Sequence, residues 1–192
     1  RKQFKDEIYW GKPITGFGDP KGKILFVGLA PAAHGGTRTG RVFTGDKSSD
    51  FLYKCLFNAN ISNQSTSDHV NDGLKIKNAF ITPALKCVPP EDKPLKVELD
   101  NCFKFFNNEL NILKNLKVVV ALGKIAFDTC KIFYSKKFEI PKYVKFQHGK
   151  SFKLKNGVNL VGCYHPSPRN VNTGRINEKM MTKLFLKVKK LD

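Results

Sequence analysis

The sequence predicts an α/β fold: a three-layer sandwich with a central, mostly parallel four-stranded sheet flanked by helices. Two observations support this prediction. Four short apolar runs, each bounded by turn residues, have the length and composition of strands buried on both faces. Segments with apolar residues at helical spacing lie between them, and strands that alternate with helices form a mostly parallel sheet covered on both faces.

The expected elements follow one another in a simple order. Residues 24–27 are apolar and partly β-branched, which favours a buried strand. Ser48 and Ser49 are candidate N-caps of a helix over residues 50–60. A second strand, residues 79–85, ends before paired prolines that must stop regular structure. The remaining expected elements are a helix over 96–113, a strand over 118–122, a helix over 124–134, an irregular or hairpin segment over 142–155, a strand over 159–164 and a helix over 177–190.

The length of the chain favours a single domain over residues 1–192, because it suffices for one substantial core but not for two. Residues 1–22 start without Met and become rich in Gly and Pro, so we expect an extended arm leading into the domain, after a longer natural start. No apolar run approaches the length of a membrane span, and the start does not resemble a signal peptide. We therefore expect an intracellular protein.

The charge of the chain is strongly positive. Lys and Arg number 34 against 16 Asp and Glu, which gives a formal net charge of +18. Such an excess attracts polyanions and favours nucleic acid as a partner, through charge neutralisation and counterion release. The alternative is a lysine-rich surface that serves thermostability or solubility alone.

A loop rich in small residues follows the first strand, at the carboxyl end where open α/β sheets bind their ligands. Gly28, Ala30 and Ala32 keep side chains out of the way, so main-chain N–H groups can face a phosphate or a planar base. The alternative is a tight turn that merely requires small residues, because an isolated Gly-rich loop is a weak indication of function.

A second loop, residues 164–170, follows the last strand, and the two loops together resemble the fifth, B-type family of the uracil-DNA glycosylase superfamily, whose members are largely thermophilic. The first loop matches through GLAPAAHG, RTGR and FTGD, and the second through HPS, an Asn three residues later and TGR. These motifs lie at residues 28–35, 38–41, 43–46, 165–167, 170 and 173–175, and further matches lie at 9–11, 16–20 and 86–90. Several motifs in the right order are more specific than any one of them.

The resemblance implies a monomeric DNA-repair enzyme that flips uracil out of DNA and hydrolyses its glycosidic bond, leaving an abasic site. Flipping is required because the bond cannot be reached inside the base stack. The family also implies that hypoxanthine or other deaminated bases are accepted. The alternative is a non-catalytic nucleic-acid-binding iron–sulfur protein of the same fold.

Two residues are the expected centre of the chemistry. His165 is placed to hydrogen-bond the base oxygen on which charge grows, and Phe43 matches a stacking aromatic of the family, with an ordinary core Phe as its alternative. Ala30 stands where other glycosylase families have an Asp or Asn that positions water. Asp46 is the nearest acidic candidate for a general base, although a turn or capping Asp is favoured. Pro83 stands where related families read the uracil edge with an Asn.

The remaining expected site residues fall into two groups. The base pocket is expected to involve Gly28, Ala30, Ala32, His34, Phe43 and Pro83, with a structural loop histidine as the alternative for His34. The DNA contacts are expected from Thr37, Arg38, Arg41, Lys47, Ser167, Pro168, Arg169 and Asn170, of which the last four form a wedge that holds the duplex open. Thr37, or the backbone of residues 32–36, is also a candidate to hold the attacking water.

Five cysteines have two expected roles. Cys55, Cys130 and Cys163 fall within apolar patterns and are expected to be buried structural residues. The family resemblance implies a [4Fe–4S] cluster held by four thiolates, two of which match Cys87 and Cys102. The other two are expected upstream of residue 1, since no matching Cys-x-x-Cys pair is present; the alternative is an incomplete or absent cluster. Its expected role is structural, because hydrolysis requires no electron transfer.

Overall fold

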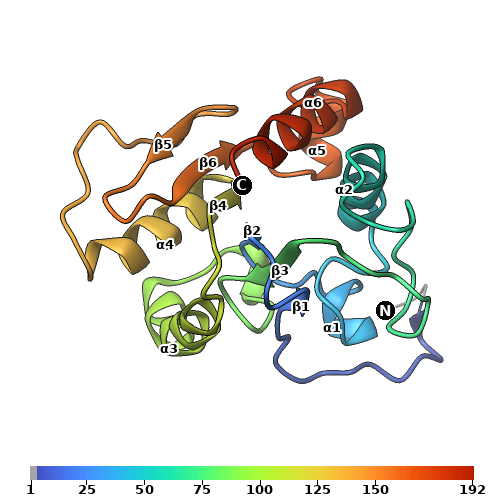
Figure 1. Cartoon of the computed structure of the whole chain (residues 1–192). Helices are drawn as coiled ribbons and strands as arrows, with labels where there is room; N and C mark the ends of the chain where they lie inside the picture. Colours follow the sequence, from blue (N-terminus) through green and yellow to red (C-terminus); the bar gives the residue numbers. More distant parts are fainter. Residues whose placement is uncertain (1–3) are drawn as a thin grey trace.

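A computed structural model describes residues 4–192 as an α/β domain built on one six-stranded sheet (Figure 1). The strand order is β1-β3-β2-β4-β6-β5. The central strands β3, β2, β4 and β6 run parallel, and the edge strands β1 and β5 pair antiparallel with their neighbours. The strands are β1 (Phe17–Gly18), β2 (Ile24–Gly28), β3 (Ala79–Pro83), β4 (Val118–Leu122), β5 (Ser151–Lys153) and β6 (Asn159–Cys163).

The four expected strands are the four parallel ones, which confirms the α/β prediction. The two edge strands were not expected as strands, because runs of two and three residues are too short for an alternating pattern to appear. β5 forms a hairpin with β6, which agrees with the hairpin interpretation of residues 142–155 rather than the irregular one. β1 lies within residues 1–22, so the described part of the expected arm includes an edge strand.

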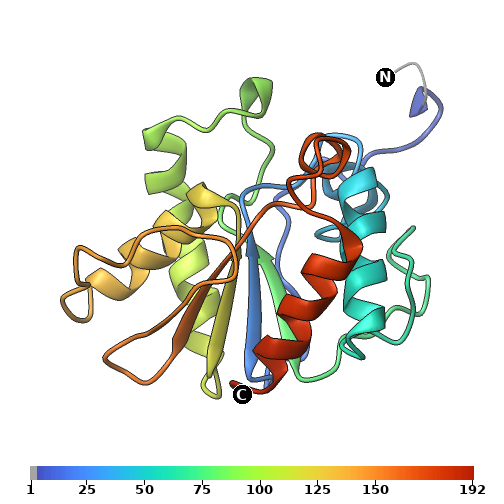
Figure 2. The same cartoon turned by 90° about the horizontal axis from the view of Figure 1, so that it is seen from above.

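Helices cover both faces of the sheet (Figures 1 and 2). On β2, Ile24 and Phe26 belong to the core shared with α2 and α6, while Leu25 and Val27 belong to the core shared with α3 and α4. This alternation follows from the period of two along a strand, and it makes β2 apolar throughout. The helices are α1 (Gly36–Thr39), α2 (Lys47–Asn58), α3 (Lys96–Ile112), α4 (Lys124–Ser135), α5 (Pro168–Asn172) and α6 (Glu178–Lys189), with a 3₁₀ turn η2 (Pro90–Asp92).

The start of α2 corrects one expectation. Asp46, not Ser48 or Ser49, is the N-cap, and its Oδ1 accepts hydrogen bonds from the backbone N–H groups of both serines. The Ser49 hydroxyl pairs in return with the Asp46 backbone N–H, which completes a capping box. α1 and α5 were not expected, since helices of four and five residues show no helical period. Within residues 4–192, no helix is both long and apolar enough to cross a membrane.

Candidate active site

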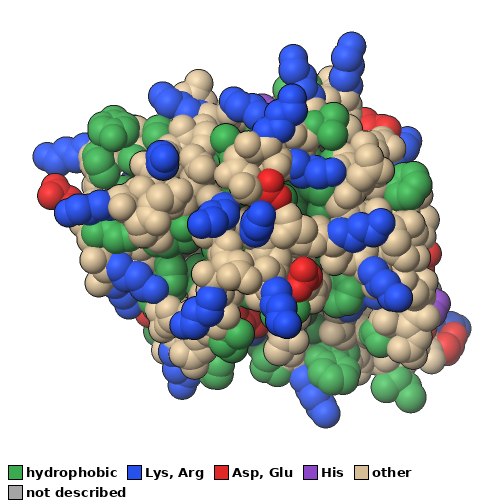
Figure 3. All heavy atoms as spheres, in the orientation of Figure 1, with side chains coloured by type: hydrophobic (Ala, Val, Ile, Leu, Met, Phe, Trp, Pro, Cys, Tyr) green, Lys and Arg blue, Asp and Glu red, His purple; other side chains and the backbone are tan. Residues whose placement is uncertain are grey.

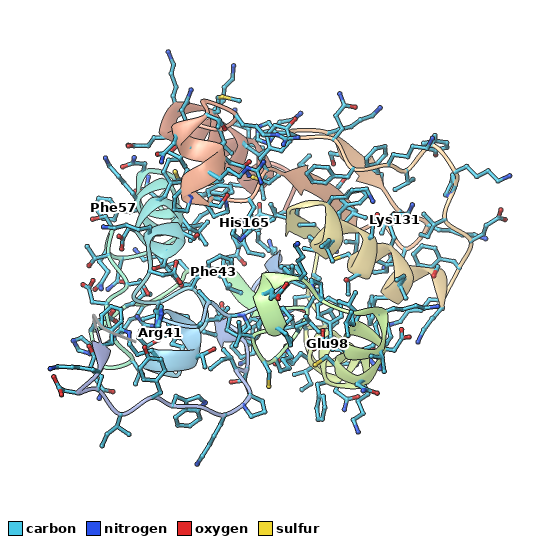
Figure 4. All side chains as sticks on the ribbon, turned by 180° about the vertical axis from the view of Figure 1, so that it is seen from behind. Arg41, Phe43, Phe57, Glu98, Lys131 and His165 are labelled. Atoms are coloured by element: carbon cyan, nitrogen blue, oxygen red, sulfur yellow. The ribbon has the colours of Figure 1, made fainter. Side chains whose placement is uncertain are left out.

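The carboxyl ends of the parallel strands carry the two loops that the sequence singles out. β2 ends at Gly28 beside Pro83 at the end of β3, and β6 ends at Cys163, two residues before His165. Figure 4 shows Phe43 and His165 next to each other near the middle of this face, with Arg41 further toward α1. The parallel sheet therefore brings the first and last motifs together, as expected.

Phe43 is held in an unusual backbone conformation. Its φ is 48°, a left-handed value that is uncommon for a bulky residue, and its side chain is only 8% exposed. The ring belongs to the core under α2 and α6, yet it also lies against His165, with 6.1 Å between the ring centroids and 34° between the planes. The core interpretation of Phe43 is confirmed, and its role as a stacking surface for the base stays a prediction.

His165 is half-buried, and its imidazole is uncharged at neutral pH. Burial lowers the pKa of its imidazole to about 4. Within the described chain its ring nitrogens have no hydrogen-bond partner, whereas its backbone carbonyl accepts from the Asn170 side-chain amide at 2.9 Å. The ring is therefore held by packing and by its backbone, and an N–H remains available to a ligand.

The Asp46 carboxylate caps the N-terminus of α2. Its Oδ1 accepts from Ser48 N–H at 2.8 Å and Ser49 N–H at 3.0 Å, and its Oδ2 lies so close to Gly35 that any side chain there would collide with it. Burial raises the pKa of this carboxyl, against the effect of the two backbone hydrogen bonds. The capping interpretation of Asp46 is confirmed, and Gly35 is the small residue that the cap requires.

Arg38 and Arg41 do not face the solvent as DNA contacts should. The Arg41 guanidinium is buried, makes an ion pair with Asp72 at 2.6 Å and donates to Ser67 and Thr44 at 3.0 and 2.9 Å. Arg38 donates to the backbone carbonyls of His34 and Gly45 and to Glu7. The expectation that these side chains meet phosphates is wrong for Arg41. Most N–H donors of Arg38 are also bonded within the protein, because both guanidinium groups hold the loop in shape.

Asp72 is the partner that sequence reasoning missed. Burial works against ionisation of its carboxyl, but hydrogen bonds from Arg41 and from two backbone N–H groups outweigh it and hold the pKa of Asp72 well below its ordinary value. Asp72 lies in a polar loop, residues 62–73, that shows no periodicity. Only the fold brings this loop over Arg41, so no local signal could have identified the pair.

The other residues expected to line the base pocket differ in exposure. His34 is exposed, and its Nδ1 lies 2.6 Å from the hydroxyl of Tyr9 on the N-terminal arm. Ala32 is exposed beside it, whereas Ala30 is half-buried. Pro83 is buried at the end of β3, and its carbonyl accepts from the Lys86 ammonium at 2.9 Å. Its backbone is therefore already occupied by the protein.

The Thr37 hydroxyl is a distinct case. Its Oγ1 is buried, and no hydrogen-bond partner lies within the described residues. A buried polar group left without a partner costs about 1–3 kcal/mol. A small polar molecule bound there would remove that cost, so Thr37 remains a candidate to hold water.

The expected wedge divides into residues that shape the loop and residues that project from it. Ser167 caps α5 by accepting from the Asn170 backbone N–H, and Asn170 turns its amide back to His165. Pro168 and Arg169 are exposed. Lys47, the first residue of α2, is also exposed, with 85% of its side chain accessible. These three residues are the expected DNA contacts that remain accessible.

Positive charge is not confined to this face. Figure 3 shows Lys and Arg side chains scattered over the opposite face as well. The net charge of +18 therefore gives a general attraction to polyanions that does not by itself single out one face.

Cys87 and Cys102 are the two cysteines that the family resemblance implies as cluster ligands. Burial raises the pKa of Cys87, and the neighbouring Cys102 adds to the shift. Cys87 is exposed and Cys102 half-buried, whereas Cys55, Cys130 and Cys163 are buried, as expected for structural residues. Within the described chain no group of three or more His, Cys, Asp or Glu side chains could hold a metal ion. Two accessible thiols thus fit two ligands of a thiolate site and no more.

Comparison with known proteins agrees with these observations. The uracil DNA glycosylase superfamily matches residues 15–189. The type-5 uracil-DNA glycosylase of Thermus thermophilus is 39% identical over 192 residues, covering all of this chain and 85% of the relative. That of Mycobacterium bovis is 40% identical, covering all of this chain and 71% of the relative. A solution structure of a putative uracil DNA glycosylase from Methanosarcina acetivorans has the same fold, with a TM-score of 0.55 and 12% identity over 93% of this chain and 98% of that one.

Proposed function

This chain belongs to the type-5 uracil-DNA glycosylases of the uracil DNA glycosylase superfamily, and we infer that it excises uracil from DNA by hydrolysis of the glycosidic bond. The observation that carries this function is the contact between Phe43 and the neutral, half-buried His165 where the two loops meet. A flat ring and a free N–H donor are what a flipped base requires of its pocket.

His165 acts as a hydrogen-bond donor to the departing base. As the glycosidic bond breaks, negative charge grows on the base, and a preorganised donor stabilises that charge in the transition state more than in the bound substrate. Burial keeps the imidazole neutral at pH 7, so no proton has to be lost or gained before it acts. Phe43 supplies the surface on which the base stacks.

No side chain is assigned to deprotonate the attacking water. Ala30 offers no acid, and the Oδ1 of Asp46 is bonded to two backbone N–H groups, so we assign no general base to the reaction. The transition state is then dissociative, with substrate phosphates stabilising the sugar cation. The buried Thr37 hydroxyl, which lacks a protein partner in the described chain, supports its role in holding the attacking water.

DNA contact is assigned to the accessible residues around the pocket. Lys47 and Arg169 supply charge for phosphates, and Pro168 at the first turn of α5 supports the duplex opening. Neither Ala30 nor Pro83 offers a side-chain hydrogen bond to the base edge, which favours loose reading and acceptance of hypoxanthine or other deaminated bases beside uracil. We propose that the protein acts as a monomer on intracellular DNA.

We also propose a [4Fe–4S] cluster. Cys87 and Cys102 would supply two of its four thiolates, and the other two would come from outside the 192 residues. When bound, the cluster would serve as a structural cross-link. It would pin the loop that contains Pro89 and Pro90 to α3, beside the face that meets DNA.

A gel assay tests the function directly. An oligonucleotide with one uracil, incubated with the protein and then treated with alkali, should be cut at that position, and the same oligonucleotide with thymine should not. His165→Ala protein is the matched control for a contaminating glycosylase. Binding of the uracil oligonucleotide without any alkali-labile product would show a DNA-binding protein that lacks the activity.

A further inference from the structure

Tyr164, which immediately precedes His165, is held by side chains from two distant segments. The His148 ring stacks on the Tyr164 ring with 4.8 Å between the centroids and 3° between the planes. The Arg175 guanidinium lies 4.5 Å from the centroid of the same ring. His148 Nδ1 also accepts a hydrogen bond from the Tyr164 backbone N–H at 3.1 Å.

His148 is fixed to the sheet by its neighbours. It forms an isolated parallel bridge with Gly162 of β6, and the Gly149 N–H donates to the Gly162 carbonyl at 2.8 Å. A Cβ at Gly162 would come within 2.5 Å of the Gln147 carbonyl oxygen, so the segment approaches β6 as closely as the backbone allows. His148 is therefore part of the rigid sheet edge rather than of a free loop.

Arg175 follows α5, and its neighbour Ile176 ties this segment to Asn170 within that helix. The next residue, Ile176, is fully buried and donates from its backbone N–H to the Asn170 carbonyl at 3.2 Å. Asn170 in turn donates its side-chain amide to the His165 carbonyl. The backbone of residues 164–165 is thus tied at both ends, by His148 at the Tyr164 N–H and by Asn170 at the His165 carbonyl.

These ties matter because the imidazole of His165 has no hydrogen bond of its own within the described chain. A catalytic His is usually oriented by a partner on its second ring nitrogen. Here the orientation must come from the contact with Phe43 and from the backbone that carries the ring. Any shift of the Tyr164 backbone would therefore move the imidazole of the adjacent His165.

We propose that His148 and Arg175 are positioning residues for uracil excision: they clamp Tyr164 and thereby set the imidazole of His165. The proposal rests on the function proposed above. The hydrogen bond to the Tyr164 N–H fixes the backbone, and the two ring contacts fix the side chain against rotation. The proposal gives neither residue a contact with the base.

Four variants separate the parts of the clamp. His148→Phe keeps a flat ring on Tyr164 but removes the Nδ1 acceptor, and His148→Asn keeps an acceptor but removes the stacked ring. Arg175→Lys keeps the charge and removes the planar group. Lys150→Gln is the matched control, because this neighbouring side chain lies over Phe152 and makes no contact with Tyr164.

Three measurements are made on each protein: the single-turnover rate on uracil DNA at saturating enzyme, the affinity for DNA with an abasic-site analogue, and the imidazole ¹⁵N signals of His165. A misplacement of about 1 Å can cost on the order of 10²-fold in rate, so His148→Phe should lose roughly 10- to 100-fold and shift the His165 signals. His148→Asn should recover part of the rate. Affinity for abasic DNA and the thermal midpoint of the control should remain as in the wild type.

The outcomes are distinguishable. Unchanged rates and unchanged His165 signals in folded His148→Phe and Arg175→Lys would overturn the clamp, even if both variants melt earlier. A loss of affinity for abasic DNA with an unchanged saturating rate would make Arg175 a DNA contact instead. An inactive wild-type protein would contradict the proposed function and not the clamp, because the His165 signals still report the position of the ring.

Discussion

Phe43 covers Gly28 so closely that a Cβ on Gly28 would come within 2.7 Å of the Phe43 ring carbon Cε2. Gly28 is the last residue of β2. Its backbone φ is one that any residue can adopt, so glycine is required here only because the Phe43 ring leaves no room for a Cβ. The end of the central strand and the Phe43 ring are therefore one packing unit, and the first residue of the GLAPAAHG motif is small for this reason.

Gly28→Ala should displace the Phe43 ring and lower the activity. A Cβ at 2.7 Å cannot be accepted without movement, and the buried ring has little room to move. We expect a single-turnover rate at least about 10-fold lower, together with a loss of roughly 1–3 kcal/mol in unfolding free energy. Gly157→Ala is the control, since its φ of 85° adds strain but nothing lies within 4 Å. A Gly28→Ala enzyme with wild-type rate would mean that the ring moves freely.

Phe43→Ala should weaken binding of the base. Loss of the stacking surface should cost roughly 1–3 kcal/mol of affinity for DNA with a non-hydrolysable deoxyuridine analogue, and less for abasic-site DNA. Because the ring is also part of the core, unfolding free energy should fall by about 3–5 kcal/mol. Phe43→Leu separates the two effects, as it keeps most of the volume without the aromatic face. Equal losses of affinity for both DNAs would leave only the core role.

The four parallel strands and four long helices could be predicted because their apolar periods are local. The edge strands and short helices could not, since pairs of residues acquire structure only from neighbours across the sheet. The Asp46 cap and the meeting of Phe43 with His165 followed from motifs and strand order, whereas the roles of the two rings toward the base stay predictions. The role of Arg41 was misjudged because exposure is not a local property: Asp72, 31 residues after Arg41, pairs with its guanidinium inside the fold. The same holds for the contact of His148 with Tyr164.

Salt dependence should separate structural from DNA-binding arginines. Each phosphate contact contributes about −0.9 to the slope of log K against log salt, so Arg169→Gln and Lys47→Gln should each make that slope shallower by up to about 1. Arg41→Gln should leave the slope unchanged and instead destabilise the fold by about 3–5 kcal/mol, because it leaves Asp72 buried without its partner. Fluorescence anisotropy over a salt series and urea unfolding give the two quantities. A reduced slope in folded Arg41→Gln protein would return Arg41 to the DNA interface.

Asp46 and His165 should differ sharply when substituted. An Asn at position 46 keeps an Oδ1 acceptor for the cap of α2, so Asp46→Asn should retain most of the single-turnover rate and stability. His165→Ala should lose roughly 10²- to 10³-fold in rate, the size typical of removing one such donor, with little change in affinity. Circular dichroism establishes that both variants are folded. The opposite order of rate losses would place a carboxylate at the centre of the mechanism.

The pH dependence of stability should carry the signature of His165. Burial lowers the pKa of the folded imidazole to about 4, from an ordinary value of 6.5. The unfolded chain therefore binds more protons between these values, and the stability due to this group is full above pH 6.5 and is lost as the pH falls toward 4. We expect the difference between pH 7 and pH 5 to be about 2 kcal/mol from this residue alone. Urea unfolding of wild type and His165→Gln at both pH values isolates it, because the substitution leaves every carboxylate in place. If the two proteins lost the same free energy of unfolding between pH 7 and pH 5, the pKa of His165 would not be lowered by folding. That result would contradict its proposed role as a neutral donor.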